Sequence, residues 1–214
     1  MALNAIVFDL DGTLVDSADA ILRGFAFALE NNGVTARCPL EQSLIGPPLM
    51  QTLARISGVE DPALLVQMAA DFKAWYDGEG CLTTPAYAGV DAMLKALVLA
   101  GVPLFIATNK RLHPTERIIK ALGWDRHFRA VYALDARTPA YPAKGEMVSA
   151  LLVEHGLATD AVIYIGDTAG DEQASRQAGV QFWGVDWGYG DLAALDVPVL
   201  STAAEILGRV AAWR

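Results

Sequence analysis

The chain has 214 residues, of which 53% are hydrophobic and 19% are charged. This composition excludes a disordered chain and predicts a sizeable core, in one large domain or two small ones. The formal net charge of -9 argues against nucleic acid and anionic membrane surfaces as main partners. It does not exclude a small anionic substrate, because a bound cation can reverse the local field.

Local features of the sequence argue against a secreted protein and against a membrane-spanning protein. The two cysteines, Cys38 and Cys81, have neither CxxC spacing nor a neighbouring histidine, so we expect reduced thiols and a cytoplasmic protein. Residues 1–12 carry no basic segment before the first apolar run, so no signal peptide is expected. Charges, Gly or Pro interrupt every apolar run before it reaches membrane-spanning length.

The first predicted element ends in two carboxylates. Residues 6–8 are apolar with high strand propensity, and Asp9 and Asp11 follow with one apolar residue between them. Alternation along a strand would place both side chains on the same side. Such a pair is costly beside a buried strand unless a cation or proton compensates it. The stretch therefore indicates either a magnesium site or carboxylates for covalent and acid–base chemistry; a simple Asp-Gly turn is the alternative.

A purely helical stretch comes next. Apolar residues recur at helical spacing, and Gly, Pro and Asn residues separate the segments, which predicts helices over residues 18–29, 52–56 and 62–76. Ser17 is a candidate N-cap for the first helix, and Asp61-Pro62 is a typical start for the third. Residues 15–85 are therefore predicted to form an all-helical domain.

After a linker at residues 83–89, strands and helices alternate. Strands are expected over residues 102–107, 130–133, 161–165, 180–185 and, as an edge strand, 197–200. Helices are expected over residues 91–100, 114–122, 144–155 and 171–178, with a last helix near the C-terminus. Strands separated by helices imply an α/β fold with a doubly wound parallel sheet. Residues 1–14 and 86–214 are predicted to form this core, with the helical domain inserted into it.

Polar side chains follow three of the predicted strands, and one lysine opens a helix between them. They are Asp9 and Asp11, then Thr108, Asn109 and Lys110, then Lys144, and last Asp167 and Asp171. Each set alone is compatible with a turn, a helix cap or a solvated lysine. However, the carboxyl ends of parallel strands share one edge of a sheet, where α/β folds bind ligands. Their coincidence at that edge indicates a functional site.

The segments DLDGTLVDS, ATN, the lone Lys144 and GDTAGD, in this order, resemble the four motifs of the haloacid dehalogenase superfamily of phosphatases. Together they span nearly the whole chain. The resemblance implies a Rossmann-like catalytic core, and the helical insertion after the first motif resembles the C1-type cap of this family. The segments IGPPL in the insertion and VDWGYG near residue 187 are similar to the branch that contains phosphoglycolate phosphatases and 5′-nucleotidases.

The resemblance implies roles for the two carboxylates of the first motif. Asp9 would attack phosphorus and form an aspartyl-phosphate. Asp11 would protonate the leaving alkoxide and then deprotonate the hydrolytic water. Mg²⁺ would be held by Asp9, the backbone carbonyl of Asp11 and Asp167. Asp171 would support the metal through water or orient Lys144.

The remaining motif residues would bind the phosphoryl group. Thr108 and the amide of Asn109 would hydrogen-bond a phosphoryl oxygen, and Lys144 would supply a fixed positive charge. In many relatives Pro follows this lysine, whereas Gly145 stands here, and Lys110 is a rival for the role. In the insertion, where relatives recognise substrate, Gly46 and Arg55 are candidate substrate-binding residues; a solvated helix face is the alternative for Arg55.

The function implied is a magnesium-dependent phosphatase of small phosphate monoesters, such as phosphoglycolate, a sugar phosphate or a nucleotide monophosphate. Asp11 favours phosphoryl transfer over dehalogenation, because a halide leaves without a proton. A phosphomutase of the β-phosphoglucomutase type and a non-catalytic phosphate-binding regulatory protein are the alternatives. The expected partner is a small phosphorylated metabolite, with no nucleic acid and no membrane, and the expected assembly is a monomer or a homodimer.

Overall fold

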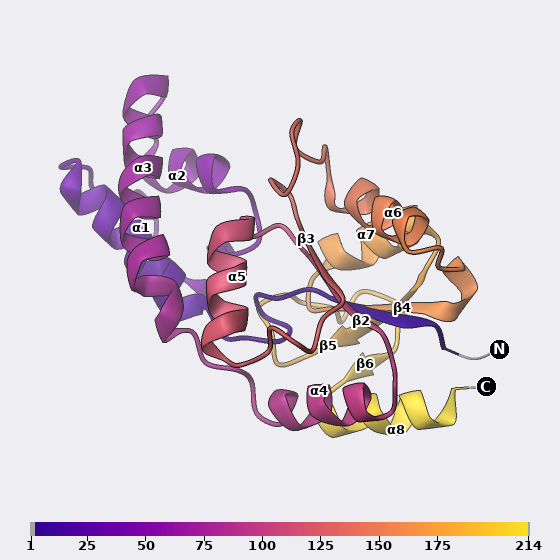
Figure 1. Ribbon diagram of the computed structural model, residues 1–214. Helices are drawn as coiled ribbons and strands as arrows, with labels where there is room; N and C mark the ends of the chain where they lie inside the picture. The colour runs from indigo at the N-terminus through magenta and orange to yellow at the C-terminus, as the bar shows by residue number, and fades with distance from the viewer. Residues whose placement is uncertain (1–2, 214) are drawn as a thin grey trace. The chain divides into compact units, whose positions relative to one another are not determined.

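The computed structural model describes residues 3–213, which form two compact units (Figure 1). The core unit contains the described residues up to Asp16 and all those from Pro85 onwards. The helical unit is Ser17–Thr84. The chain passes from one unit to the other twice, so the helical unit is an insertion in the core unit.

A six-stranded parallel sheet organises the core unit, in the strand order β3-β2-β1-β4-β5-β6. The strands are β1 (Ala5–Phe8), β2 (Leu104–Thr108), β3 (Ala130–Ala133), β4 (Val162–Gly166), β5 (Gln181–Val185) and β6 (Val199–Leu200). The first strand lies inside the sheet, so the chain builds outwards to one edge and then to the other. The predicted doubly wound parallel sheet is confirmed.

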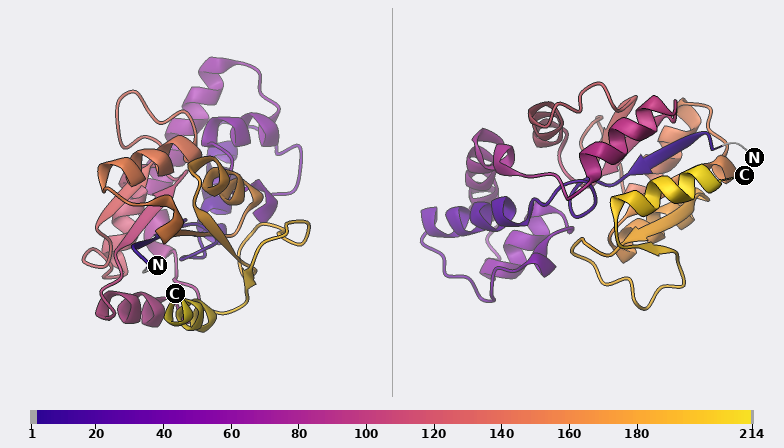
Figure 2. Two further views of the ribbon diagram at one scale, coloured as in Figure 1. Left: turned by 90° about the vertical axis from the view of Figure 1, so that its right-hand side faces the viewer. Right: turned by 90° about the horizontal axis from the view of Figure 1, so that it is seen from below.

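Helices cover both faces of the sheet, with α6 and α7 on one face and α4 and α8 on the other (Figures 1 and 2). The helices of the core unit are α4 (Val90–Leu99), α5 (Leu112–Ala121), α6 (Lys144–Glu154), η3 (Thr159–Ala161), α7 (Ala169–Ala178) and α8 (Ala203–Ala212). All residues of β1, β2 and β4 are buried. This explains why these strands are almost continuous apolar runs in the sequence.

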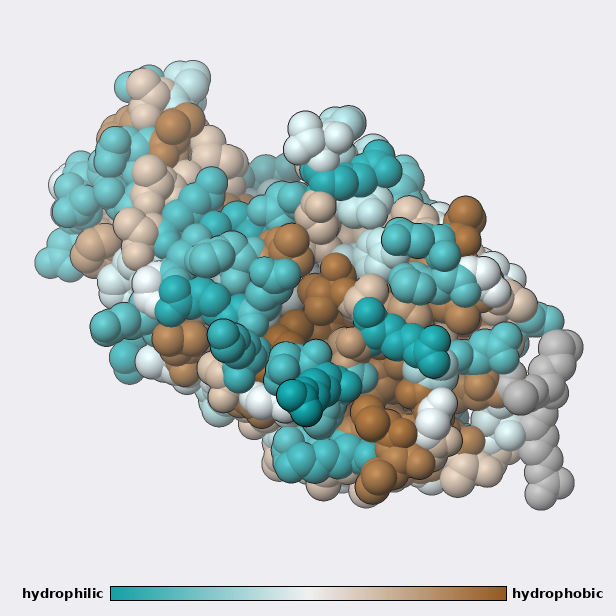
Figure 3. Space-filling model, viewed as in Figure 1, coloured by the Kyte–Doolittle hydropathy of each residue, from teal (hydrophilic) through white to brown (hydrophobic). Residues whose placement is uncertain are grey.

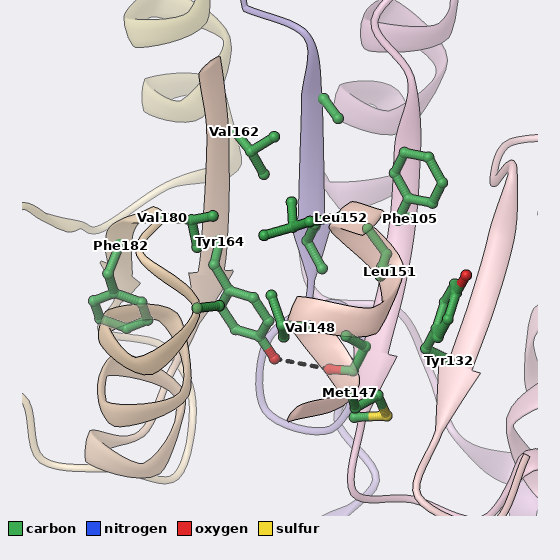
Figure 4. Close-up of a cluster of buried hydrophobic side chains, with 14 of the residues drawn as sticks. Phe105, Tyr132, Met147, Val148, Leu151, Leu152, Val162, Tyr164, Val180 and Phe182 are labelled. Carbon is green, nitrogen blue, oxygen red and sulfur yellow. Dashed lines mark hydrogen bonds between the residues drawn. The ribbon is translucent and has the colours of Figure 1, made fainter. Parts of the chain in front are cut away.

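A hydrophobic cluster joins α6 to the sheet (Figure 4). Met147, Val148 and Leu151 of α6 pack against side chains of β2 and β4, among them Phe105. Tyr164 of β4 is fully buried in this cluster, and its hydroxyl donates a hydrogen bond of 2.7 Å to the carbonyl of Ala107 (dashed in Figure 4). This packing fixes the start of α6 beside the carboxyl ends of β2 and β4.

The helical unit contains no strand within its residues 17–84. Its elements are α1 (Ala18–Asn31), η1 (Gln42–Leu44), α2 (Leu49–Ser57), α3 (Pro62–Gly78) and η2 (Gly80–Thr83). Asp61 accepts a hydrogen bond from the amide of Ala63, as expected for a helix that starts at Pro62. Ser17 is the N-cap residue of α1, as predicted, but its side chain makes no capping hydrogen bond. None of the described helices is long and apolar enough to cross a membrane.

The surface in Figure 3 mixes hydrophilic and hydrophobic residues, with a hydrophobic patch near the C-terminal end of α4. Leu99, the last residue of this helix, is 88% exposed. Exposed apolar side chains of this kind are ordinary on folded proteins.

Candidate active site

The sheet register brings the first and last predicted motifs together. Phe8 is aligned with Ile165 of β4, and the amide of Asp9 donates a hydrogen bond of 2.9 Å to the carbonyl of Ile165. Asp9 and Asp167 therefore both lie directly beyond the carboxyl edge of the sheet. The strand alignment of β1 with β2 brings Thr108 to the same edge. This is the edge at which ligands bind in open α/β sheets.

Three buried carboxylates form a cluster at this edge. Asp9, Asp167 and Asp171 offer oxygens that lie within 4.8 Å of one another. Burial raises the pKa of Asp9 to about 7 against the lowering effect of Lys144, and the neighbouring carboxylates contribute to the rise. Burial and Asp171 likewise raise the pKa of Asp167 to about 6. The buried negative charge of this cluster is therefore only partly compensated by the positive charges of the protein itself.

Lys144, the first residue of α6, places its ammonium group against this cluster. Its Nζ lies 2.6 Å from Asp171 Oδ1 and 3.0 Å from Asp9 Oδ1. Burial lowers the pKa of Lys144, but the carboxylates of Asp171 and Asp9 outweigh it and hold that pKa well above its usual value. The lysine therefore stays charged and supplies a fixed positive charge beside Asp9.

The residues present fit a magnesium ion. Asp9 Oδ1 is buried and accepts no hydrogen bond from the described part of the chain, because the 3.0 Å contact with Lys144 is an ion pair without hydrogen-bond geometry. Mg²⁺ prefers carboxylate and carbonyl oxygens, and its charge would offset the repulsion in the cluster. Asp171 is less suited to direct ligation. One of its oxygens binds Lys144 and the other accepts two hydrogen bonds from Thr168 in a capping box.

Asp167 is held by two residues that the sequence analysis did not single out. Its Oδ1 accepts a hydrogen bond of 3.1 Å from the hydroxyl of Thr13, and its Oδ2 accepts one of 2.8 Å from the amide of Tyr189. Thr13 directly follows Gly12 of the first motif, and Tyr189 lies in the VDWGYG segment, which the sequence connected with a branch of the family but with no role in the site. A carboxylate that is oriented in this way is typical of a metal ligand.

Asp11 is paired with a second lysine, Lys110. The Nζ of Lys110 lies 2.9 Å from Asp11 Oδ1 and 3.0 Å from Oδ2. Because β1 ends at Phe8, Asp11 lies in the following turn, and the predicted strand alternation from Asp9 to Asp11 does not occur. Both lysines that competed for one predicted role are thus present at the site, each beside its own aspartate.

The other predicted residues divide between the two units. Thr108, the last residue of β2, is buried and its hydroxyl accepts a hydrogen bond of 3.2 Å from the amide of Lys110, while Asn109 is exposed beside it. Gly46 lies in the loop before α2, and Arg55 is exposed on α2. The structure thus assembles the core-unit candidates at one sheet edge and describes Gly46 and Arg55 within the helical unit only.

Several known proteins are similar to this chain over most of its length. The chain is 33% identical to a 5′-nucleotidase of Pseudomonas aeruginosa over 192 residues, which cover 86% of this chain and 83% of the relative. It is 30% identical to a tyrosine-protein kinase of Mycobacterium tuberculosis (89% and 65% covered) and 30% identical to a phosphoglycolate phosphatase of Xylella fastidiosa (86% and 80% covered).

A similar protein is found among solved structures. A haloacid dehalogenase-like family hydrolase from Streptococcus pneumoniae superposes with a TM-score of 0.84 at 27% identity, with 97% of this chain and 98% of that chain covered. Residues 6–185 match the family described as haloacid dehalogenase-like hydrolase, a range that includes every core-unit site residue named above except Tyr189. The resemblance noted in the sequence is confirmed, and the chain belongs to the haloacid dehalogenase-like hydrolase family.

Proposed function

We propose that this protein is a magnesium-dependent phosphatase that hydrolyses small phosphate monoesters through a phosphoaspartate at Asp9. The observation that carries the proposal is the state of Asp9. It is buried at the ligand-binding edge of the sheet, its Oδ1 accepts no hydrogen bond from the described residues, and a charged lysine lies 3.0 Å away. This carboxylate is available to act as a nucleophile on an anionic group.

The residues of the chain then divide the two chemical steps between them. Asp9 attacks phosphorus while the bond to the ester oxygen breaks, and Asp11 gives its proton to that oxygen. A water molecule next attacks phosphorus, Asp11 takes a proton from the water, and the bond between phosphorus and Asp9 breaks. Lys144 and Thr108 stabilise the negative charge of the transferring group.

Mg²⁺ is the cofactor of this proposal. Asp9, Asp167 and the backbone carbonyl of Asp11 would hold it, and Asp171 would orient Lys144 by the observed ion pair. When bound, the ion neutralises the repulsion between the acidic cluster and an incoming phosphate. The two hydrogen bonds to Asp167 would keep that ligand in place.

The relatives support the class of substrate. Two of them are named 5′-nucleotidase and phosphoglycolate phosphatase, and both names describe enzymes that remove phosphate from small molecules. A small phosphorylated metabolite is accordingly the proposed partner. Gly46 and Arg55 of the helical unit are the residues proposed to distinguish one ester from another.

The test is phosphate release from a panel of small phosphate esters, with magnesium and with chelator, by wild type and Asp9→Asn. We expect release that needs magnesium and is lost in the variant. Asp196→Asn, a substitution at an exposed site in the loop before β6, is the matched control and should remain fully active. A well-folded wild type that releases phosphate from no ester would exclude the phosphatase. A phosphorylated enzyme that persists and needs a bisphosphate for turnover would instead indicate the phosphomutase.

A further inference from the structure

A second lysine is built into the site, and the reaction described above gives it no task. The Nζ of Lys110 lies 2.9 and 3.0 Å from the two carboxylate oxygens of Asp11. Both side chains are largely buried, with 6% of Lys110 and 15% of Asp11 exposed. A nearly equidistant, shielded contact of this kind holds a carboxylate in one orientation far better than a surface ion pair does.

The backbone around Lys110 is itself anchored. The amide of Lys110 donates to the hydroxyl of Thr108, and the amide of Leu112 at the start of α5 donates a hydrogen bond of 2.7 Å to Asp135 Oδ1. Lys110 is therefore fixed between the end of β2 and the first turn of α5. Its ammonium group is thus presented to Asp11 from a segment whose backbone is hydrogen-bonded on both sides of Lys110.

We propose that Lys110 is a positioning residue for Asp11, which it orients for proton transfer to and from the oxygen at phosphorus; this inference rests on the proposed function. Lys144 contacts Asp9 and Asp171, whereas Lys110 contacts Asp11. The two lysines therefore have separate tasks. Lys144 acts on the phosphoryl group, and Lys110 acts through the acid and base.

The proton balance shows when this task matters. As the ester bond breaks, the O–H bond of Asp11 breaks and its proton joins the leaving oxygen, so negative charge forms on Asp11 beside the Lys110 ammonium group. In the second step Asp11 regains a proton from the attacking water. Lys110 keeps its own protons throughout. An alkoxide leaving group needs the proton, whereas p-nitrophenolate is stable enough to leave without it.

The experiment compares kcat/KM for two esters, p-nitrophenyl phosphate and the alkyl phosphate that wild type cleaves best. For Lys110→Met, we expect a fall of about 100-fold with the alkyl ester and less than about threefold with p-nitrophenyl phosphate, since only the first needs general acid catalysis. Lys110→Arg keeps the positive charge and should recover most of the alkyl phosphatase activity. Lys144→Met should impair both esters alike.

Two controls separate positioning from structural damage. Lys95→Met removes a lysine from a surface pair with Asp91 and should change neither rate. Asp11→Asn combined with Lys110→Met should be no worse than Asp11→Asn alone, because residues that act through one group are not additive. Equal losses with both esters, or additive losses in the double variant, would overturn the inference while leaving the phosphatase in place. A wild type that cleaves neither ester would overturn both.

Discussion

Burial raises the pKa of Asp9 to about 7, and the carboxylates of Asp171 and Asp167 add to the rise while Lys144 opposes it. An aspartate whose pKa is higher in the folded than in the unfolded state destabilises the fold when it is ionised. The loss of unfolding free energy is complete above pH 7. It decreases as the pH falls from 7 towards 3.8, the ordinary pKa of an aspartate. Asp9, the proposed nucleophile, therefore lowers the stability of the metal-free protein.

Asp9→Asn should for this reason stabilise the metal-free protein while it abolishes turnover. In chelator at pH 8, we expect a rise in Tm of about 5 °C, the size that one or two kcal/mol produces in a chain of this length. The gain should be smaller at pH 5.5, where Asp9 in wild type already carries its proton. Thermal unfolding followed by circular dichroism at both pH values measures this. Asp196→Asn serves as the control, and a Tm gain that does not depend on pH would contradict the explanation.

Removal of the Lys144 ammonium group should, in contrast, lower the stability of the protein. Lys144→Met leaves Asp9 and Asp171 buried without the cation that contacts both. Breaking a buried ion pair from one side typically costs about 3 kcal/mol or more, whereas the exposed Lys95–Asp91 pair should be worth less than about 1 kcal/mol. Urea unfolding of Lys144→Met and Lys95→Met in chelator compares them. Adding Asp9→Asn should restore part of the stability that Lys144→Met loses; no recovery would argue against a charge effect.

At the scale of elements, the loops that follow the strands hold the site in place. Gly188, in the loop after β5, lies so close to Asp167 that a Cβ atom there would collide with the Asp167 side chain and with the carbonyl of Gly12. The next residue, Tyr189, donates its amide to Asp167 Oδ2 and its hydroxyl to Asp16 Oδ1 at 3.0 Å. The close approach of this loop to Asp167 therefore depends on glycine.

Gly188→Ala should displace Asp167 and weaken magnesium binding. We expect the magnesium concentration for half-maximal activity to rise by at least about 10-fold, the usual cost of disturbing a residue that supports a metal ligand. Gly208→Ala is the matched control. A Cβ at Gly208 in α8 meets no heavy atom within 4 Å, so the change should stabilise the helix by about 0.5–1 kcal/mol without affecting activity. Unchanged magnesium dependence in Gly188→Ala would show that the loop does not position Asp167.

The same loops explain how far the sequence could predict the structure. Strands such as β1 and β4 were predictable because burial on both faces makes them apolar throughout, and their ends gave Asp9 and Asp167. The start of α2 at Leu49 was predicted three residues too late, because Pro48 was interpreted as part of a longer break although Pro is compatible with a helix start. Tyr189 and Lys110 could not be assigned partners, since their contacts join residues 22 and 99 positions apart in the chain.

At the scale of the whole molecule, two segments of the chain connect the helical unit to the core unit, and these two segments are hydrogen-bonded to each other. Val15 and Ala86 form an antiparallel bridge, and the amide of Asp16 donates a hydrogen bond of 2.9 Å to the carbonyl of Pro85. The chain thus leaves the core unit and returns to it at neighbouring points. All six strands and the acidic cluster belong to the core unit. A fold with these properties tolerates changes in the inserted segment, because its ends are already held together.

Replacement of Ser17–Thr84 by a short Gly-Ser linker, of about four residues as in a hairpin loop, should therefore leave a folded core unit. We expect this variant to unfold cooperatively and to keep magnesium-dependent hydrolysis of p-nitrophenyl phosphate, because Asp9, Asp11 and Lys144 remain. It should lose the preference for one natural ester over another, since Gly46 and Arg55 are removed. Arg55→Ala in the full chain is the matched point variant, and it should weaken that preference without altering the rate with p-nitrophenyl phosphate. Unchanged selectivity in the shortened protein would show that substrate recognition resides in the core unit, and a shortened protein that fails to fold would show that the helical unit is part of the core's own stability.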